Sequence, residues 1–247
     1  MLKKKLQADA SCPLRSLSAA VLDTETTSLD VKSARIVELG VVLMIDGRME
    51  RQHTFSTYVN PEGAIPQSAR MIHGISDDMV AAAPAFDAAY KSCLAFTGDA
   101  LVLGYSLGFD LAVLKAEHER AGLPWKAPRF LDVRDLVRIL NPPLPDFSLD
   151  KVALWLGIEV KDRHTAVGDA IVTGEMLLAI LPRLRAIGIR TLGEAEDACR
   201  KRRAIVLHLD LKNYTGLANS VDPSELAHHV DAIFRSFDRL VYRCFSS

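Results

Sequence analysis

The chain has 247 residues, 49% of them hydrophobic and 25% charged, which is long enough for one or two domains with a sizeable core. Its 30 basic residues balance 31 acidic ones, and the net charge of −1 excludes a protein that binds nucleic acid through bulk positive charge, although not an enzyme that holds it at one site. Four scattered cysteines, no apolar run of membrane-spanning length and no signal-peptide core predict a cytoplasmic protein without a membrane partner.

The first predicted elements are three consecutive strands. Residues 19–22 form a short apolar run, and residues 35–59 contain two β-rich segments on either side of Asp46-Gly47, a dipeptide suited to a tight hairpin turn. The three strands together predict an antiparallel meander.

Helices alternate with short strands in the remainder of the chain. Glycines, prolines and capping residues mark where each element ends. The pattern predicts an α/β domain with a mixed sheet over about residues 17–190. The predicted elements are a partly helical connection over 60–76, helices within 84–98, 109–122, 148–157 and 165–188, a strand within 100–106, a strand-to-helix segment over 130–140, and a helix over 191–203 that opens with a capping box.

Two acids, Asp23 and Glu25, follow the first apolar run. Side chains of residues i and i+2 share one face of a strand, so the two carboxylates project together while Thr24 and Thr26 face the other way. Neighbouring carboxylates at the end of a buried strand stay ionised only where a cation, hydrogen bonds or solvent compensates their repulsion. An exposed strand end also explains such a pair, because D-x-E alone is a weak motif. Other acids must therefore decide between the two interpretations.

Further acids and a histidine lie where two helices are predicted to begin. Asp110 lies in the first turn of one helix, where the macrodipole by itself also favours an acid. Asp169 lies four residues after the predicted N-cap Thr165, between two small residues. His164 is five residues before Asp169, about 500° of helical rotation, so the two would not share a helix face. We therefore expect His164 on the entering loop, which suits a proton acceptor better than a rigid metal ligand.

The order of these motifs closely resembles that of the DnaQ-like exonucleases. D-T-E-T-T at 23–27, G-F-D at 108–110 and H-x-x-x-x-D at 164–169 match the DEDDh subgroup, which includes the proofreading ε subunit of bacterial DNA polymerase III and related RNases. The resemblance covers about residues 17–185, including the spacing between the motifs.

This resemblance implies a ribonuclease-H-like fold, a mixed β-sheet flanked by helices, and a 3′–5′ exonuclease activity. It implies that Asp23, Glu25, Asp110 and Asp169 hold two Mg²⁺ or Mn²⁺ ions and that His164 takes a proton from the attacking water. General chemistry agrees, because two cations about 3.5–4 Å apart stabilise both the attacking and the leaving oxygen of a phosphodiester. Hard oxygen ligands also suit Mg²⁺ or Mn²⁺ better than Zn²⁺.

Family analogy also suggests how the substrate binds. It places Thr26 at the 3′-terminal sugar and the loop that carries His73 close by, although a purely structural role for His73 is an alternative. Phe109 is expected in the core rather than as a platform for a base. The implied substrate is the 3′ end of single-stranded nucleic acid, with DNA favoured and RNA as the alternative.

Three positions depart from the family pattern. Tyr105 and Ser106 replace the usual His-Asn before the second acid motif, and Ser28 replaces the usual glycine after the first. Neither Tyr105 nor Ser106 stands at a metal ligand of the family, so we expect the core chemistry to survive with altered substrate positioning or rate. Ser28 is expected to alter a turn and little else. The alternative is a weakly active or silent module that binds nucleic acid or nucleotide in a signalling protein. The five filled catalytic positions favour an active enzyme.

The C-terminal part predicts a second, smaller unit. Residues 200–203 form a basic cluster, typical of a helix C-terminus, a linker or a contact to a nucleic-acid backbone. The segment after it weakly resembles the start of a class III nucleotide cyclase domain, with Asp210 at that family's first metal-binding acid. A tail of this size cannot form a cyclase domain, so we expect no cyclase activity. The predicted domains are an exonuclease domain over 17–190 and an αβ extension over 191–247, with a polymerase or a fused signalling domain as the expected protein partner.

Overall fold

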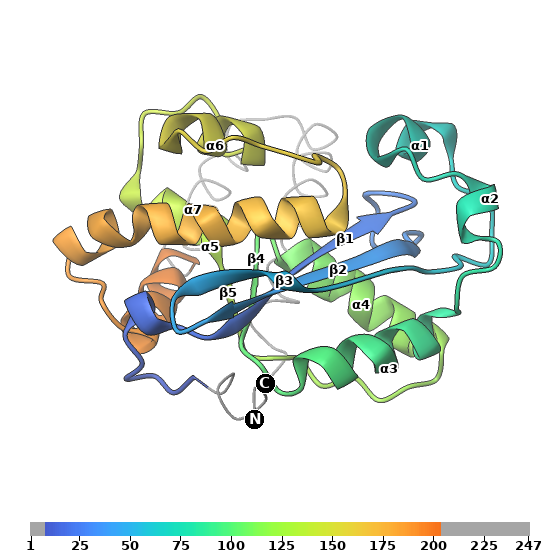
Figure 1. The fold of residues 1–247 in the computed structure, drawn as a ribbon, viewed down its shortest axis with the longest axis horizontal. Coiled ribbons are helices and arrows are strands. Elements are labelled where there is room, and N and C mark those ends of the chain that lie inside the picture. Colours follow the sequence, from blue (N-terminus) through green and yellow to red (C-terminus); the bar gives the residue numbers. More distant parts are fainter. Residues whose placement is uncertain (1–7, 204–247) are drawn as a thin grey trace, which may run out of the picture.

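Five strands form one mixed sheet in the order β3-β2-β1-β4-β5, and helices cover both of its faces (Figure 1). The computed structural model describes residues 8–203. Among these residues, no helix is both long and apolar enough to cross a membrane. The strands are β1 (Ala19–Thr26), β2 (Ile36–Ile45), β3 (Arg48–Tyr58), β4 (Val102–Gly104) and β5 (Phe130–Asp132). A 3₁₀ turn, η2 (Leu14–Ser16), precedes the sheet, and the α-helices are α1 (Gln67–His73), α2 (Asp77–Val80), α3 (Phe86–Thr97), α4 (Gly108–Arg120), α5 (Val133–Leu140), α6 (Leu149–Leu156) and α7 (Ala166–Ala186).

The first three strands form the predicted antiparallel meander. β1 pairs with β2 and β2 with β3, both antiparallel, while β4 pairs in parallel with β1 and with β5. Asp46 and Gly47 turn the chain between β2 and β3 with φ angles of 50° and 71°. Both angles are left-handed, as a two-residue type I′ hairpin turn requires. The predicted meander and mixed sheet are confirmed.

Both faces of the sheet are buried, so its central strands are apolar without alternation. On one face Val21 and Val42 pack into a core with α5, α6 and α7. On the other face Leu22 and Val41 pack with α3 and α4. Figure 1 shows α7 along one face and α3 with α4 along the opposite one. β1, the strand that carries Asp23 and its neighbours, is therefore held at the centre of the molecule.

A close contact joins the start of α7 to the middle of β2. A Cβ on Gly40 would lie 2.4 Å from the backbone carbonyl carbon of Ala166. Any residue larger than glycine would therefore clash with the backbone here. Glu38 accepts a hydrogen bond from the backbone N–H of Ala166 at 3.1 Å. Gly40 is also the partner of Asp23 across the β1–β2 ladder. These contacts place the first turn of α7 directly beside the acidic end of β1.

The capping box predicted for the last helix is present. The Glu194 carboxylate accepts from the backbone N–H of Thr191 at 2.9 Å, and the Thr191 hydroxyl accepts from that of Glu194 at 3.3 Å. Residues 192–203 are helical, and Cys199 on this helix is buried in the same core as α7. The helix thus packs onto the sheet domain, while the division at 190/191 stays a prediction. Asp210 and the cyclase-like segment lie outside the described residues.

Candidate active site

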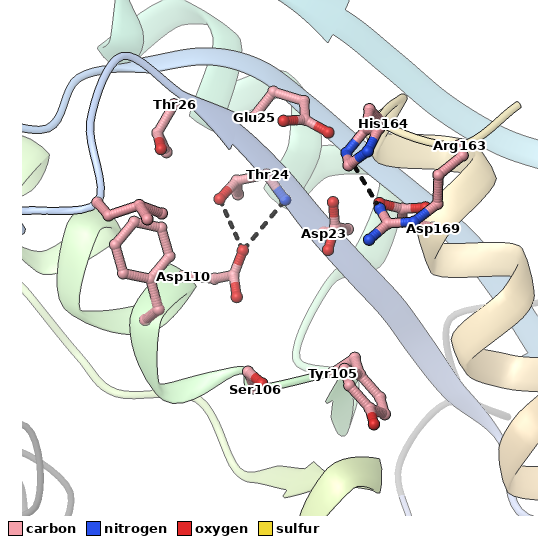
Figure 2. A pocket seen from close by; sticks show the side chains of 12 residues that line it. Asp23, Thr24, Glu25, Thr26, Tyr105, Ser106, Asp110, Arg163, His164 and Asp169 are labelled. Carbon is pink, nitrogen blue, oxygen red and sulfur yellow. Dashed lines mark hydrogen bonds and ion pairs between the residues drawn. The ribbon is translucent and has the colours of Figure 1, made fainter. Parts of the chain in front are cut away.

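The predicted site residues meet at one edge of the sheet. β1 and β4 run parallel, so their carboxyl ends lie side by side, and the residues that follow each strand share one pocket. The pocket has a volume of about 330 Å³. Its lining includes the four acids and the histidine singled out in the sequence, together with Thr26 but not His73. The lining residues are Asp23, Thr24, Glu25, Thr26, Leu29, Tyr105, Ser106, Phe109, Asp110, Arg163, His164 and Asp169 (Figure 2).

Asp23 lies between the acid from α4 and the acid from α7. Figure 2 shows Asp110 on one side of it and Asp169 on the other. Asp110 is only 4% exposed, and one of its carboxylate oxygens accepts from the Thr24 hydroxyl at 2.7 Å and from the Thr24 backbone N–H at 3.1 Å. Thr24, whose side chain alternates with those of Asp23 and Glu25, thereby fixes the carboxylate of Asp110.

Glu25, His164 and Asp169 form the other half of the site. One ligand atom from each of the three lies within 4.8 Å of the other two. Asp169 is 4% exposed, and its Oδ1 is buried without a hydrogen-bond partner. His164 precedes the N-cap Thr165, on the loop as the spacing predicts, with a left-handed φ of 64°. A left-handed φ is energetically unfavourable for any residue other than glycine, so the surrounding structure must hold His164 in this conformation.

Burial raises the pKa values of all four carboxyls, and repulsion by other members of the cluster adds to the rise for Asp23 and Glu25. Burial raises the pKa of Asp23 well above its ordinary value, and the charges of Asp110 and Asp169 raise it further. Burial is also the main reason that the pKa of Glu25 rises to about 8 and that of Asp110 to about 7. The pKa of Asp169 is raised by burial too, although Arg163 opposes the rise. Such a cluster of unfavourable negative charge is stabilised by a bound cation.

The donor set fits a divalent metal ion. The donors are carboxylate oxygens, with no sulfur, and the unpartnered Oδ1 of Asp169 is a buried acceptor that a cation would satisfy. Oxygen-rich sites of this kind suit hard cations such as Mg²⁺ and Mn²⁺.

Comparison with known proteins gives the family. The model of the RNase_T family, described as exonuclease, matches residues 20–177, which is more than half of the chain. The chain belongs to this exonuclease family. The predicted DnaQ-like resemblance is thereby confirmed, while the cyclase-like resemblance of the tail stays a prediction.

Relatives of this exonuclease domain include proteins named for DNA polymerase III. The chain is 34% identical over 195 residues, 78% of its length, to a DNA polymerase III subunit epsilon-like protein of Rhodobacter capsulatus, of which the match covers 28%. The chain spans less than a third of the length of the curated relatives it matches.

Solved structures confirm the ribonuclease-H-like fold predicted for the domain. One is Exonuclease X in complex with 5′ overhanging duplex DNA, at 24% identity and a TM-score of 0.58, covering 73% of this chain and 98% of that one. Another is the nuclease domain of 3′hExo, a DEDDh family member bound to rAMP, at 19% identity and a TM-score of 0.59, covering 70% and 94%.

The carboxyl cluster of this exonuclease domain predicts a specific pH dependence. Between its ordinary pKa of 4.5 and its folded pKa of about 8, Glu25 keeps a proton in the folded protein that the unfolded chain has released. The contribution of Glu25 to stability is therefore lost as pH rises through this range. Metal binding requires the deprotonated carboxylate, so we expect the rise in Tm caused by Mn²⁺ to grow over the same interval.

Thermal melts in EDTA and in Mn²⁺ at several pH values between about 5 and 8 measure this dependence. Glu25→Gln is the matched comparison, because it removes one titrating group and should make both curves less steep, while Asp23, Asp110 and Asp169 still titrate. A Mn²⁺-induced Tm shift in the wild type that is equal at the two ends of the range would contradict the prediction.

Two of the three residues that depart from the family pattern, Tyr105 and Ser106, line the pocket. The Tyr105 hydroxyl donates to the backbone carbonyl of Phe147 at 2.8 Å, so this side chain is tied into the core. Ser106 has a left-handed φ of 57° and accepts a hydrogen bond from Arg134 at 2.9 Å through its hydroxyl.

Phe109 packs against the core that contains α3 and α4, as expected, and it also lines the pocket.

His73 lies at the end of α1, outside the pocket lining. Its Nδ1 accepts from the backbone N–H of Ile75 at 3.0 Å, while its Nε2 is buried without a hydrogen-bond partner. Burial lowers the pKa of His73, the backbone of Thr26 partly opposes this, and the charge of His164 lowers the pKa further. These interactions place His73 close to Thr26 and His164 but outside the pocket lining.

Sequence reasoning missed one residue that lines the pocket, Arg163, and one that supports it from outside, Glu38. Glu38 anchors the start of α7, and Arg163 donates to the Asp169 carboxylate inside the pocket. Arg163 is adjacent to His164 but belongs to no spaced motif. The sequence does carry a signal for Glu38, which is its position in the second predicted strand. Antiparallel pairing of the first two strands brings Glu38 opposite Glu25.

Proposed function

We propose that the domain is a metal-dependent 3′–5′ exonuclease that releases nucleotides from the 3′ end of single-stranded nucleic acid, with DNA favoured. The observation that supports this most strongly is the convergence of four carboxyls and His164, from β1, α4 and the start of α7, on one pocket of a chain that belongs to an exonuclease family.

Each residue has a role in this proposal. Asp23, Glu25, Asp110 and Asp169 would hold two Mg²⁺ or Mn²⁺ ions. Such ions, when bound, neutralise the negative charge that develops on the phosphate and on the leaving oxygen. His164 would accept the proton of the attacking water, and its place within 4.8 Å of Glu25 and Asp169 supports that role.

The walls of the pocket support a single unpaired nucleotide as the bound group. Its volume of about 330 Å³ lies at the lower end of the range for small-ligand sites, which suits one terminal nucleotide rather than a base pair. Leu29, 76% exposed at the rim, and Phe109 offer apolar surface to a terminal base. Thr26, which lines the pocket, would meet the terminal sugar, and His73 would support the backbone of Thr26 from outside the pocket lining. DNA is favoured because the Rhodobacter capsulatus relative is named for a DNA polymerase, and a polymerase is accordingly the proposed partner.

The test is digestion of 5′-labelled oligonucleotides with Mg²⁺ or Mn²⁺. We expect a ladder that shortens from the 3′ end of single-stranded DNA, slower digestion of blunt duplex DNA, and no cleavage in EDTA. A short RNA of the same sequence, run in parallel, measures the preference for DNA. Binding of single-stranded DNA without any cleavage would contradict the proposal and favour the silent binding module instead.

A further inference from the structure

Arg163 is the one arginine or lysine among the twelve residues that line the pocket. It lies on the loop between α6 and α7, directly before His164, and its side chain is 28% exposed. No step of the proposed hydrolysis uses it. A permanent positive charge inside a pocket built from four carboxyls therefore needs its own explanation.

The guanidinium of Arg163 connects two carboxylates of very different exposure. On the outer side, Nε donates to Oδ1 of Asp150 at 2.9 Å, and Nη2 lies 3.5 Å from its other oxygen. On the inner side, Nη1 donates to Oδ2 of Asp169 and lies 3.3 Å from Nδ1 of His164 (Figure 2). The side chain of Asp150 is 59% exposed and that of Asp169 is 6% exposed. Asp150 thus holds the guanidinium from the surface, and Nη1 points into the pocket.

Two consequences follow if the proposed function is correct, and the inference rests on it. A divalent ion on Asp169 would bring a second positive charge next to Nη1, so the ion and Arg163 compete for the same carboxylate. The strand that then enters brings phosphate groups into the pocket. A guanidinium is well suited to phosphate, because its planar donors match the phosphate oxygens and its charge does not titrate.

We propose that Arg163 changes partners during the reaction cycle. In the metal-free protein it is the counter-ion of Asp169, and in the loaded enzyme it binds a phosphate of the substrate strand. Asp150 holds the guanidinium in both states and is a positioning residue. Arg163 is then a substrate-binding residue, and its pairing with Asp169 opposes metal binding before substrate arrives.

This exchange predicts two effects of opposite sign for Arg163→Ala. Without nucleic acid, the variant should bind Mn²⁺ roughly tenfold more tightly, because the ion no longer displaces a charged hydrogen bond. With Mg²⁺ present, KM for a single-stranded oligonucleotide should rise roughly tenfold or more, with a smaller change in kcat, because a contact to phosphate is lost. Asp150→Asn should also raise KM, but by a smaller factor than Arg163→Ala, because it removes only the group that positions the guanidinium.

Isothermal titration with Mn²⁺ and steady-state digestion measure the two effects on the full chain. Arg51→Ala is the matched control, since Arg51 is paired with Glu175 of α7 outside the pocket and should change neither quantity. Arg163→Lys keeps the positive charge but not the planar set of guanidinium donors. Its Mn²⁺ affinity should therefore lie between those of the wild type and Arg163→Ala, while its KM should stay nearly as high as that of Arg163→Ala. Thermal melts in EDTA verify that each variant is folded.

The outcomes separate this inference from the proposed function. A wild type that neither binds Mn²⁺ nor digests DNA overturns both. A wild type that digests DNA, beside an Arg163→Ala variant with unchanged Mn²⁺ affinity and KM, overturns only the role of Arg163. A variant in which Mn²⁺ affinity and KM both worsen also overturns it, because that result indicates a purely structural residue.

Discussion

Replacing Asp23 by asparagine should lower kcat/KM by about 1,000-fold or more and, at the same time, raise the Tm of the metal-free protein. The loss follows because Asp23 lies between the two halves of the carboxyl cluster, and losing one ligand removes several kcal/mol of charge stabilisation. The gain in stability follows because burial and the neighbouring acids raise the pKa of Asp23, so its carboxylate is unfavourable in the folded state. Digestion of a 5′-labelled oligonucleotide and thermal melts in EDTA measure the two effects.

Asp99→Asn is the matched control for this experiment. Asp99 is exposed and lies outside the pocket, so the same change of chemistry should alter neither quantity. An Asp23→Asn variant that keeps near wild-type activity would show that the carboxyl cluster does not carry the reaction. A variant that loses activity but is also less stable in EDTA would show that the carboxylate of Asp23 is not unfavourable in the folded, metal-free protein.

Replacing His164 by asparagine should slow digestion by about 100- to 10,000-fold and leave Mn²⁺ binding nearly unchanged. A general base contributes a factor of this size, and asparagine cannot accept the proton at neutral pH. Asparagine is chosen because it tolerates the left-handed backbone that His164 adopts, so the change tests chemistry rather than strain. Single-turnover rates and the Mn²⁺-induced shift in Tm provide the measurements.

His164→Ala serves as the comparison for His164→Asn. If both variants lose activity equally while the Mn²⁺-induced shift in Tm persists, the missing group is the imidazole. Full activity in His164→Asn would exclude His164 as the proton acceptor. Loss of the Mn²⁺-induced shift would instead indicate that His164 takes part in holding the metal.

The local elements could be predicted because each has a local physical cause. The two positive φ angles at Asp46 and Gly47 follow from a dipeptide that tolerates them, and the helix capped by Thr191 and Glu194 follows from a three-residue spacing. The i, i+2 relation of Asp23 and Glu25 likewise needs only the alternation of a strand. These features do not depend on distant parts of the chain.

The contacts that assemble the site could not be read from local patterns. Glu38 caps a helix that begins 128 residues later, and Gly40 is required only because the backbone at Ala166 packs against it. The role of Arg163 depends on Asp150 and Asp169, which approach it from two different helices. Pairing register and loop path decide such contacts, and both arise from tertiary packing.

In the proposed enzyme, carboxyls from three separate segments form one divalent-metal centre, and anomalous diffraction from crystals grown with Mn²⁺ is the decisive experiment. We expect manganese density within coordination distance, about 2.0–2.6 Å, of carboxylate oxygens of Asp23 and Asp169, with a second ion about 3.5–4 Å away. Crystals in which manganese occupies other sites, while Arg163 remains paired with Asp169 and the pocket carries no anomalous density, would exclude a divalent-metal centre formed by these carboxyls.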